Sequence, residues 1–146
     1  MNVLFVCTGN TCRSPLAEAF LRRRAQEEAL PLAVQSAGLF ASAPFPASAS
    51  SRNAAAAYGL TLETHVSQPV TEALLRWADA VYAMTSGHLA RLQAQFPAHW
   101  EKMTVLTEQE IGDPFGCGQD VYDRCACDIR EAVYALPLSG LKAGGA

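Results

Sequence analysis

The chain has 146 residues, which suits one compact domain, and half of its residues are hydrophobic. The net charge of −3 argues against nucleic acid or an anionic membrane surface as a partner held by the overall field, so any affinity for phosphate must come from a local site. Neither a basic secretory leader nor an apolar run of membrane-spanning length is visible, so a cytoplasmic location is expected.

The first expected elements surround a short polar segment. Residues 2–6 are apolar and predict a buried strand, and residues 7–14, which follow it, are small and polar. A helix is predicted next, with Ser14 as its N-cap and Pro15 at its first helical position. The three consecutive arginines at 22–24 are interpreted as a solvated face of this helix.

The rest of the chain alternates between expected strands and helices. Strands are predicted at residues 32–37, 80–84 and 103–106, and helices at residues 52–58, 71–77, 87–96 and 119–136. This alternation predicts an α/β fold: a single domain, residues 1–146, with a four-stranded parallel sheet flanked by helices on both faces and a frayed tail from about residue 138. Ligands of such sheets bind at the carboxyl ends of strands, which favours the loop after the first strand as a site.

That loop carries a cysteine and an arginine, Cys7 and Arg13, separated by five residues. A loop that wraps into a helix N-terminus aims several backbone N–H groups at one point and forms an anion cradle. Arg13 can clamp two phosphoryl oxygens with its planar fork. The other residues of this predicted phosphate-binding loop are Thr8, Gly9, Asn10, Thr11, Cys12 and Ser14.

The cradle also suits a covalent mechanism. Its positive field favours the thiolate of Cys7, which is a nucleophile aimed at phosphorus. Neither a metal nor a cofactor is expected, because the N–H groups and Arg13 supply the charge stabilisation. Asp113 is the best candidate for a proton donor, since Pro114 fixes the backbone after it and nearby glycines let the loop swing over the cradle.

The run from Cys7 to Ser14 near the N-terminus, with Asp113 and Pro114 late in the chain, resembles the low-molecular-weight protein tyrosine phosphatase family. The resemblance covers nearly the whole chain and implies the same four-stranded parallel sheet. It also implies Cys7 as nucleophile, Arg13 as phosphate binder, and Asp113 as general acid and then general base.

The same resemblance assigns supporting roles. Asn10 and Ser14 hold the loop and the thiolate, while Ser36 and His65 join the hydrogen-bond network that supports Asn10. Cys12 resembles the second loop cysteine of the family, which can form a reversible disulfide with the nucleophile under oxidation.

The choice of substrate depends on fewer residues. Thr11 stands where tyrosine-specific members usually carry a larger aliphatic residue, and Phe115 stands where they typically show a tyrosine. This pattern is similar to the bacterial protein arginine phosphatase branch, which implies a phosphoarginine substrate. Phe40 and Phe115 are expected to form aromatic walls that stack on a guanidinium plane, although such walls equally suit a phenyl ring. Hydrolysis of phosphotyrosine is therefore the alternative.

Two further readings stay open. An arsenate reductase uses a similar loop with additional cysteines, and Cys117, Cys125 and Cys127 invite that comparison, although positions 125 and 127 project from different sides of a helix. A non-enzymatic phosphate-binding module would keep Arg13 but has no need of a cysteine and an aspartate together. The expected partners are phosphorylated proteins, with a monomer as the default state. His88 and His99 are expected to be solvated.

Overall fold

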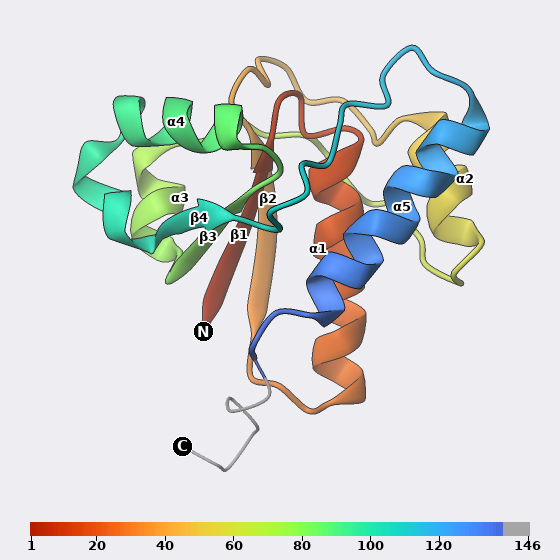
Figure 1. Cartoon of the computed structure of the whole chain (residues 1–146), viewed down its shortest axis with the longest axis horizontal. Helices are drawn as coiled ribbons and strands as arrows, with labels where there is room; N and C mark the ends of the chain where they lie inside the picture. The colour runs from red at the N-terminus through yellow and green to blue at the C-terminus, as the bar shows by residue number, and fades with distance from the viewer. Residues whose placement is uncertain (139–146) are drawn as a thin grey trace.

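The computed structural model describes residues 1–138, which form a four-stranded sheet with helices on both faces (Figure 1). All neighbouring strands are parallel, and their order is β2-β1-β3-β4. The strands are β1 (Asn2–Cys7), β2 (Ala33–Gly38), β3 (Ala80–Ala83) and β4 (Met103–Val105). The predicted α/β class and parallel sheet are confirmed.

The helices divide between the two faces of the sheet. Those in the structure are α1 (Arg13–Glu27), α2 (Ala49–Ala56), α3 (Glu72–Trp77), α4 (Ser86–Gln95), the 3-10 helix η1 (Pro97–Lys102) and α5 (Gln119–Tyr134). Helices α1, α2 and α5 lie on one side, and α3 and α4 on the other (Figure 1). Along β1, Val3 and Phe5 pack toward the first group while Leu4 and Val6 pack toward the second. This central strand is buried on both faces, which explains its continuous apolar sequence.

Two helix starts differ from those predicted. Helix α1 begins at Arg13, so the prediction of Ser14 as N-cap is wrong. The Ser14 hydroxyl is engaged instead with the preceding loop, where it accepts a hydrogen bond from Asn10 Nδ2 at 2.7 Å. Pro15 still lies in the first turn, where a missing N–H breaks no helical bond. Helix α2 begins before the predicted residue 52, because Ser48 Oγ caps it by accepting from Ser51 N at 3.2 Å.

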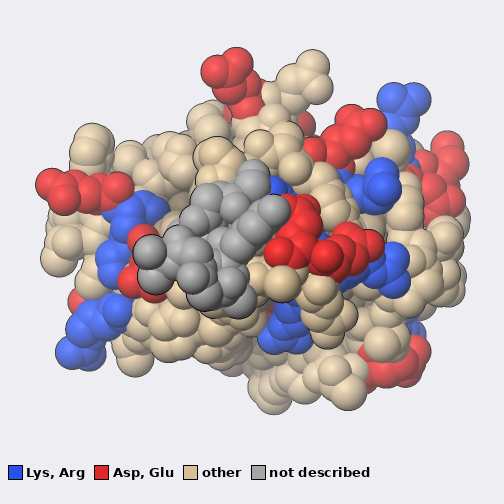
Figure 2. Space-filling model, turned by 90° about the horizontal axis from the view of Figure 1, so that it is seen from below, with Lys and Arg blue, Asp and Glu red and all other residues tan. Residues whose placement is uncertain are grey.

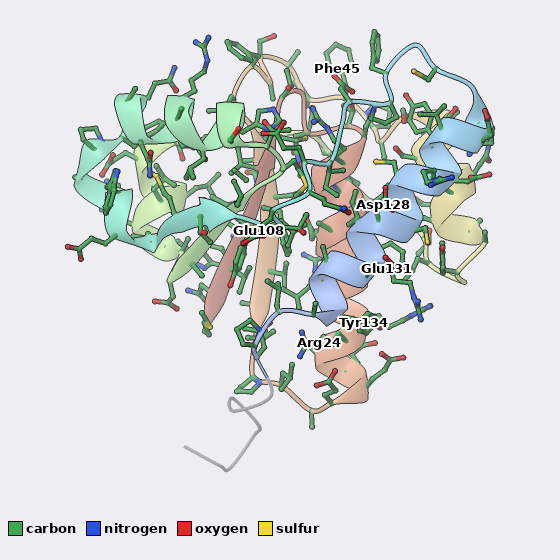
Figure 3. All side chains as sticks on the ribbon, viewed as in Figure 1. Arg24, Phe45, Glu108, Asp128, Glu131 and Tyr134 are labelled. Carbon is green, nitrogen blue, oxygen red and sulfur yellow. The ribbon has the colours of Figure 1, made fainter. Side chains whose placement is uncertain are left out.

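The predicted solvated face of the first long helix is wrong for one of its arginines. Arg24 is only 3% exposed, and its guanidinium donates to the carbonyls of Val133 at 2.9 Å and Leu136 at 2.8 Å. Val133 lies in the last turn of α5 and Leu136 just beyond its end, and Figure 3 shows Arg24 beside this end of the helix. Arg24 therefore links helix α1 to the C-terminal end of helix α5.

The described part of the chain ends at Leu138. Leu138 is buried, so the predicted fraying does not include it, and residues 139–146 lie outside the described part. On the face seen in Figure 2, lysine and arginine side chains lie beside aspartate and glutamate side chains. No helix within residues 1–138 combines the length and apolar character that crossing a membrane requires.

Candidate active site

The loop between β1 and α1 lies at the topological switch point of the sheet. From β1 the chain passes to β2 on one side, and the later strand β3 pairs with β1 on the other side. The crossovers therefore diverge at the carboxyl end of β1, which leaves a crevice above that strand. Residues 8–12 fill this position and lead directly into α1.

Asn10 is the residue that gives this loop its shape. Its φ of 58° lies in the left-handed region, which asparagine tolerates better than most residues, and its side chain is completely buried. Asn10 Nδ2 donates to Ser14 Oγ at 2.7 Å and to Ser36 Oγ at 2.9 Å, and its Oδ1 accepts from Gln68 N at 3.0 Å. The backbone oxygen of Asn10 meets His65 Nε2 at 2.7 Å. The structure thus brings Ser36 and His65 to Asn10, and adds Gln68, which the sequence did not single out.

Gly38, at the end of β2, is required by the close approach of this loop. A Cβ atom at position 38 would lie 2.7 Å from the carbonyl oxygen of Thr8 and 2.9 Å from Asn10 N. Both neighbours are backbone atoms, so no side-chain rotation relieves the clash. The absence of a side chain at Gly38 therefore lets the loop between β1 and α1 rest directly on β2.

The sulfur of Cys7 lies beneath the loop with one hydroxyl beside it. Cys7 is 2% exposed, and its Sγ lies 2.9 Å from Ser14 Oγ. Because Ser14 Oγ already accepts from Asn10, its own hydrogen is free to donate to the sulfur. The Ser14 hydroxyl therefore lies in position to donate a hydrogen bond to Cys7 Sγ.

Arg13 is held rigidly on the other side of the loop. It is 3% exposed, its NH1 donates to the carbonyl oxygen of Ile111 at 2.9 Å, and its NH2 donates to Thr8 Oγ1 at 3.2 Å. Asp113 lies close by, with its Oδ2 at 3.7 Å from Arg13 NH2, and about half of its side chain is exposed. The predicted proton donor therefore lies beside the predicted phosphate clamp, although about 100 residues separate them in sequence.

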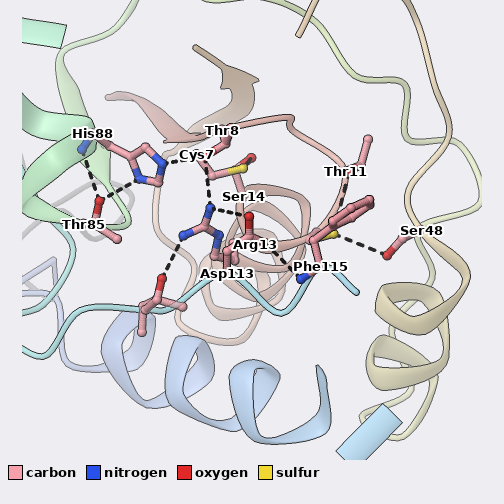
Figure 4. Close-up of polar contacts among 12 residues, drawn as sticks. Cys7, Thr8, Thr11, Arg13, Ser14, Ser48, Thr85, His88, Asp113 and Phe115 are labelled. Carbon is pink, nitrogen blue, oxygen red and sulfur yellow. Dashed lines mark hydrogen bonds and ion pairs between the residues drawn. The ribbon is translucent and has the colours of Figure 1, made fainter. Parts of the chain in front are cut away.

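These residues surround a cavity of about 230 Å³. Its lining consists of Cys7, Thr8, Gly9, Thr11, Cys12, Arg13, Asp113 and Phe115. Larger hollows of about 310 and 610 Å³ lie elsewhere, but neither is lined by a cysteine, so chemistry rather than size identifies the site. Figure 4 shows Cys7, Thr8 and Asp113 around Arg13, with Thr11 and Phe115 farther away on one side.

The two expected aromatic walls behave differently. Phe115 lines the cavity and is 77% exposed, so its ring is available to a substrate. Phe40 is not among the lining residues, and the guanidinium carbon of Arg91 lies 4.9 Å from the centre of its ring. A cation from helix α4 thus already occupies one face of Phe40.

His88 is the residue that sequence reasoning missed. The prediction that it is solvated is wrong, because it is 9% exposed and its Nε2 lies 2.8 Å from Thr8 Oγ1 (Figure 4). The contact joins residues 80 positions apart, so no local sequence pattern could predict it. His99 is also shielded, with its ring 2.5 Å from Glu72 Oε1 and its side chain 10% exposed.

The remaining cysteines lie at different depths. Cys12 Sγ is buried between Ser48 Oγ and Tyr122 Oη, at 3.6 Å from each. Cys125 is buried on α5, and this burial raises the pKa of its thiol to about 12, whereas Cys117 is exposed. No group of metal-binding side chains gathers anywhere in residues 1–138.

A parallel α/β sheet whose switch-point loop carries a buried cysteine and a buried arginine around one cavity is the architecture of a cysteine-dependent phosphatase. The chain belongs to the low molecular weight phosphotyrosine protein phosphatase family, whose model matches residues 2–143. Comparison with known proteins thus confirms the family expected from the loop sequence.

The relatives of the chain include enzymes for two substrates. The protein-arginine-phosphatase of Bacillus subtilis (strain 168) is 39% identical over 142 residues, which cover 93% of this chain and 94% of the relative. The low molecular weight protein-tyrosine-phosphatase Etp of Escherichia coli (strain K12) is 37% identical over 127 residues, or 84% of this chain and 82% of the relative. A solved YwlE arginine phosphatase mutant with a phosphorylated active site serine has a TM-score of 0.87 and 38% identity, covering 91% of each chain.

Proposed function

We propose that this chain hydrolyses phosphoarginine in proteins through a cysteinyl-phosphate intermediate on Cys7. Arg13 holds the phosphoryl group, and Asp113 acts as general acid and then as general base. The observation that carries the proposal is that Thr11, Asp113 and Phe115 line the same cavity as the nucleophile. The similarity to the Bacillus subtilis protein-arginine-phosphatase supports the choice of substrate.

The first chemical step transfers the phosphoryl group to sulfur. The Cys7 thiolate attacks phosphorus, the S–P bond forms, and the P–N bond to the substrate guanidine breaks. The leaving nitrogen takes the electron pair of that bond together with a proton from the Asp113 carboxyl group. Arg13 and the loop N–H groups stabilise the negative charge on the phosphoryl oxygens.

The second step returns the enzyme to its starting state. A water oxygen attacks phosphorus while the Asp113 carboxylate takes one of its protons. The S–P bond breaks, the electron pair returns to Cys7 as a thiolate, and inorganic phosphate leaves. Asp113 Oδ1 accepts a hydrogen bond from Phe115 N at 3.0 Å, which orients the carboxylate for both proton transfers.

The Thr11 hydroxyl favours phosphoarginine over phosphotyrosine as the substrate. A phosphoarginine side chain brings several N–H donors into the cavity, whereas a phenyl ring brings none. Among the described residues, Thr11 Oγ1 makes only a long contact of 3.7 Å with Cys12 Sγ, so its lone pairs are available to such a donor. The unprotonated oxygen of the Asp113 carboxyl group offers a second acceptor at the same cavity wall.

Phosphotyrosine is the second candidate substrate. The exposed ring of Phe115 packs on a phenyl group as readily as on a guanidinium plane. Similarity to the tyrosine phosphatase Etp, at 37% identity, supports this candidate almost as strongly as the arginine phosphatases support the first.

The substitution Thr11→Ile tests the proposal, because it replaces the hydroxyl acceptor by an aliphatic group. We expect wild type to prefer a phosphoarginine protein over a phosphotyrosine peptide, and Thr11→Ile to lower that preference by about tenfold, the effect of one hydrogen bond. Thr104→Ile, on the exposed edge strand β4, is the matched control and should keep the wild-type preference. An unchanged ratio in Thr11→Ile would remove Thr11 as the source of selectivity.

A further inference from the structure

We propose that His88 is a positioning residue that turns the Thr8 hydroxyl so that its hydrogen points into the phosphate cavity and its lone pairs hold Arg13. The inference rests on the proposed function in one respect, namely that the cavity binds a phosphoryl group. It does not depend on which phosphorylated side chain the enzyme prefers.

A continuous set of contacts runs from helix α4 to the phosphate clamp. Thr85 caps α4, and its Oγ1 accepts from the backbone N of His88 at 3.1 Å. The same oxygen lies 3.1 Å from His88 Nδ1, while His88 Nε2 lies 2.8 Å from Thr8 Oγ1. Thr8 Oγ1 in turn accepts from Arg13 NH2 at 3.2 Å. His88 is therefore fixed at both ring nitrogens, and Thr8 is its only link to Arg13 among these contacts.

The tautomer of His88 decides what the Thr8 hydroxyl does. If Nε2 carries the proton, Thr8 Oγ1 accepts from both His88 and Arg13, and its own hydrogen remains free. If Nδ1 carries the proton, Nε2 accepts the Thr8 hydrogen instead, and Thr8 has nothing to donate. Thr8 lines the cavity, and a phosphoryl group offers only acceptors. A bound phosphoryl group therefore selects the tautomer with its proton on Nε2.

The surroundings of His88 favour the neutral ring. A protonated ring cannot accept from Thr85 at Nδ1, and it would place a positive charge beside Arg13. Burial, followed by the nearby Arg13, lowers the pKa of His88, while Asp113 and Glu110 oppose this shift. Burial and the proximity of Arg13, which both favour the neutral ring, result from the position of His88 against Thr8.

The test compares two amides that differ in reach. In His88→Gln the amide nitrogen can occupy the place of Nε2 and donate to Thr8, whereas in His88→Asn the shorter amide reaches only the place of Nδ1. The measured quantities are kcat/KM for an aryl phosphate and the dissociation constant of inorganic phosphate. We expect His88→Asn to weaken both by about tenfold, as loss of one oriented hydrogen bond implies, and His88→Gln to stay within about threefold of wild type.

A double-mutant cycle with Thr8→Val separates positioning from a general structural effect. If His88 acts through Thr8, adding His88→Asn to Thr8→Val should change kcat/KM by less than about twofold. His99→Gln, at a shielded histidine of η1 that does not line the cavity, is the control and should match wild type.

Two results would overturn the positioning role: equal losses in His88→Asn and His88→Gln, or the same loss from His88→Asn with and without Thr8. Circular dichroism and thermal unfolding of each variant verify that the proteins compared are folded. Failure of phosphoarginine turnover in wild type would contradict the proposed substrate while leaving these measurements with aryl phosphate and inorganic phosphate intact.

Discussion

Asn10 Nδ2 lies 2.9 Å from Ser36 Oγ, and this contact joins the loop between β1 and α1 to strand β2. Ser36 Oγ in turn donates a hydrogen bond to Glu18 Oε1 on helix α1 at 2.6 Å. Within residues 1–138 no buried side-chain nitrogen or oxygen is left without a hydrogen-bond partner, so this polar network is fully satisfied. A satisfied buried network fixes one geometry, whereas the loss of one member leaves its partners unpaired.

Replacing Asn10 should therefore damage both stability and catalysis. Asn10→Gly removes the three side-chain hydrogen bonds but keeps the left-handed backbone accessible, and should lower the free energy of unfolding by about 3 kcal/mol, at about 1 kcal/mol each. Asn10→Ala adds a backbone cost of about 1 kcal/mol at a φ of 58°. Urea unfolding of the pair measures both effects. Equal stability of Asn10→Gly and wild type would show that the network carries no net stabilisation.

Gly38→Ala should displace the phosphate-binding loop without touching a catalytic side chain. The new Cβ would meet the Thr8 carbonyl oxygen at 2.7 Å, so the loop backbone must move. A displacement of about 1 Å at a catalytic site costs about 100-fold in rate, and kcat/KM should fall by that order. Full activity in Gly38→Ala would contradict the close packing of loop and strand.

Asp113→Asn should lower the rate of the chemical step while keeping the affinity for inorganic phosphate. The amide cannot transfer a proton, so kcat should fall by about 100-fold to 10,000-fold for a substrate with a basic leaving group. Inhibition by inorganic phosphate should persist, because Arg13 and the loop remain in place. Asp128→Asn, an exposed position on α5, serves as the control. A kcat close to that of wild type would exclude Asp113 as the proton donor.

The stability of the protein should depend on pH through His88. Burial and the proximity of Arg13 lower the pKa of this ring in the folded protein, whereas the unfolded chain keeps a value near 6.5. Between those two values the unfolded state binds more protons, so the free energy of unfolding falls as the pH drops below about 6.5. His88→Gln does not titrate, and it should lose less stability than wild type between pH 7 and pH 5. Identical losses in the two proteins would contradict the lowered pKa.

The sequence predicted those features that depend on local pattern. The alternation of apolar runs with helix signals predicted the parallel sheet, and the short helix expected at residues 71–77 is present as α3, capped by Thr71 Oγ1, which accepts from Leu74 N at 3.2 Å. The segment from Cys7 to Arg13 follows a strand and enters a helix, as its residues indicated. In each of these cases the interactions that decide the structure lie within a few residues of one another.

The features that escaped prediction depend on contacts between distant segments. Ser14 looked like an N-cap because its hydroxyl suits one, but Asn10 and Cys7 use that hydroxyl in the folded loop. His88 looked solvated because its sequence neighbours are polar, yet Thr8 approaches it from the loop after β1. Phe40 looked like a cavity wall, and Arg91 from α4 covers its ring instead. Local sequence indicates which role suits a side chain, but contacts with distant segments decide which hydrogen bonds and packing contacts it makes.

The most direct test of the account is phosphate release from a phosphoarginine protein by wild type and by Cys7→Ser, with a phosphotyrosine peptide measured alongside. The account predicts a higher kcat/KM of wild type for phosphoarginine than for phosphotyrosine. Cys7→Ser should lose turnover of both substrates while still binding inorganic phosphate, because Arg13 and the loop N–H groups are unchanged. Hydrolysis that survives in Cys7→Ser would contradict the covalent mechanism, and faster turnover of phosphotyrosine by wild type would contradict the proposed substrate.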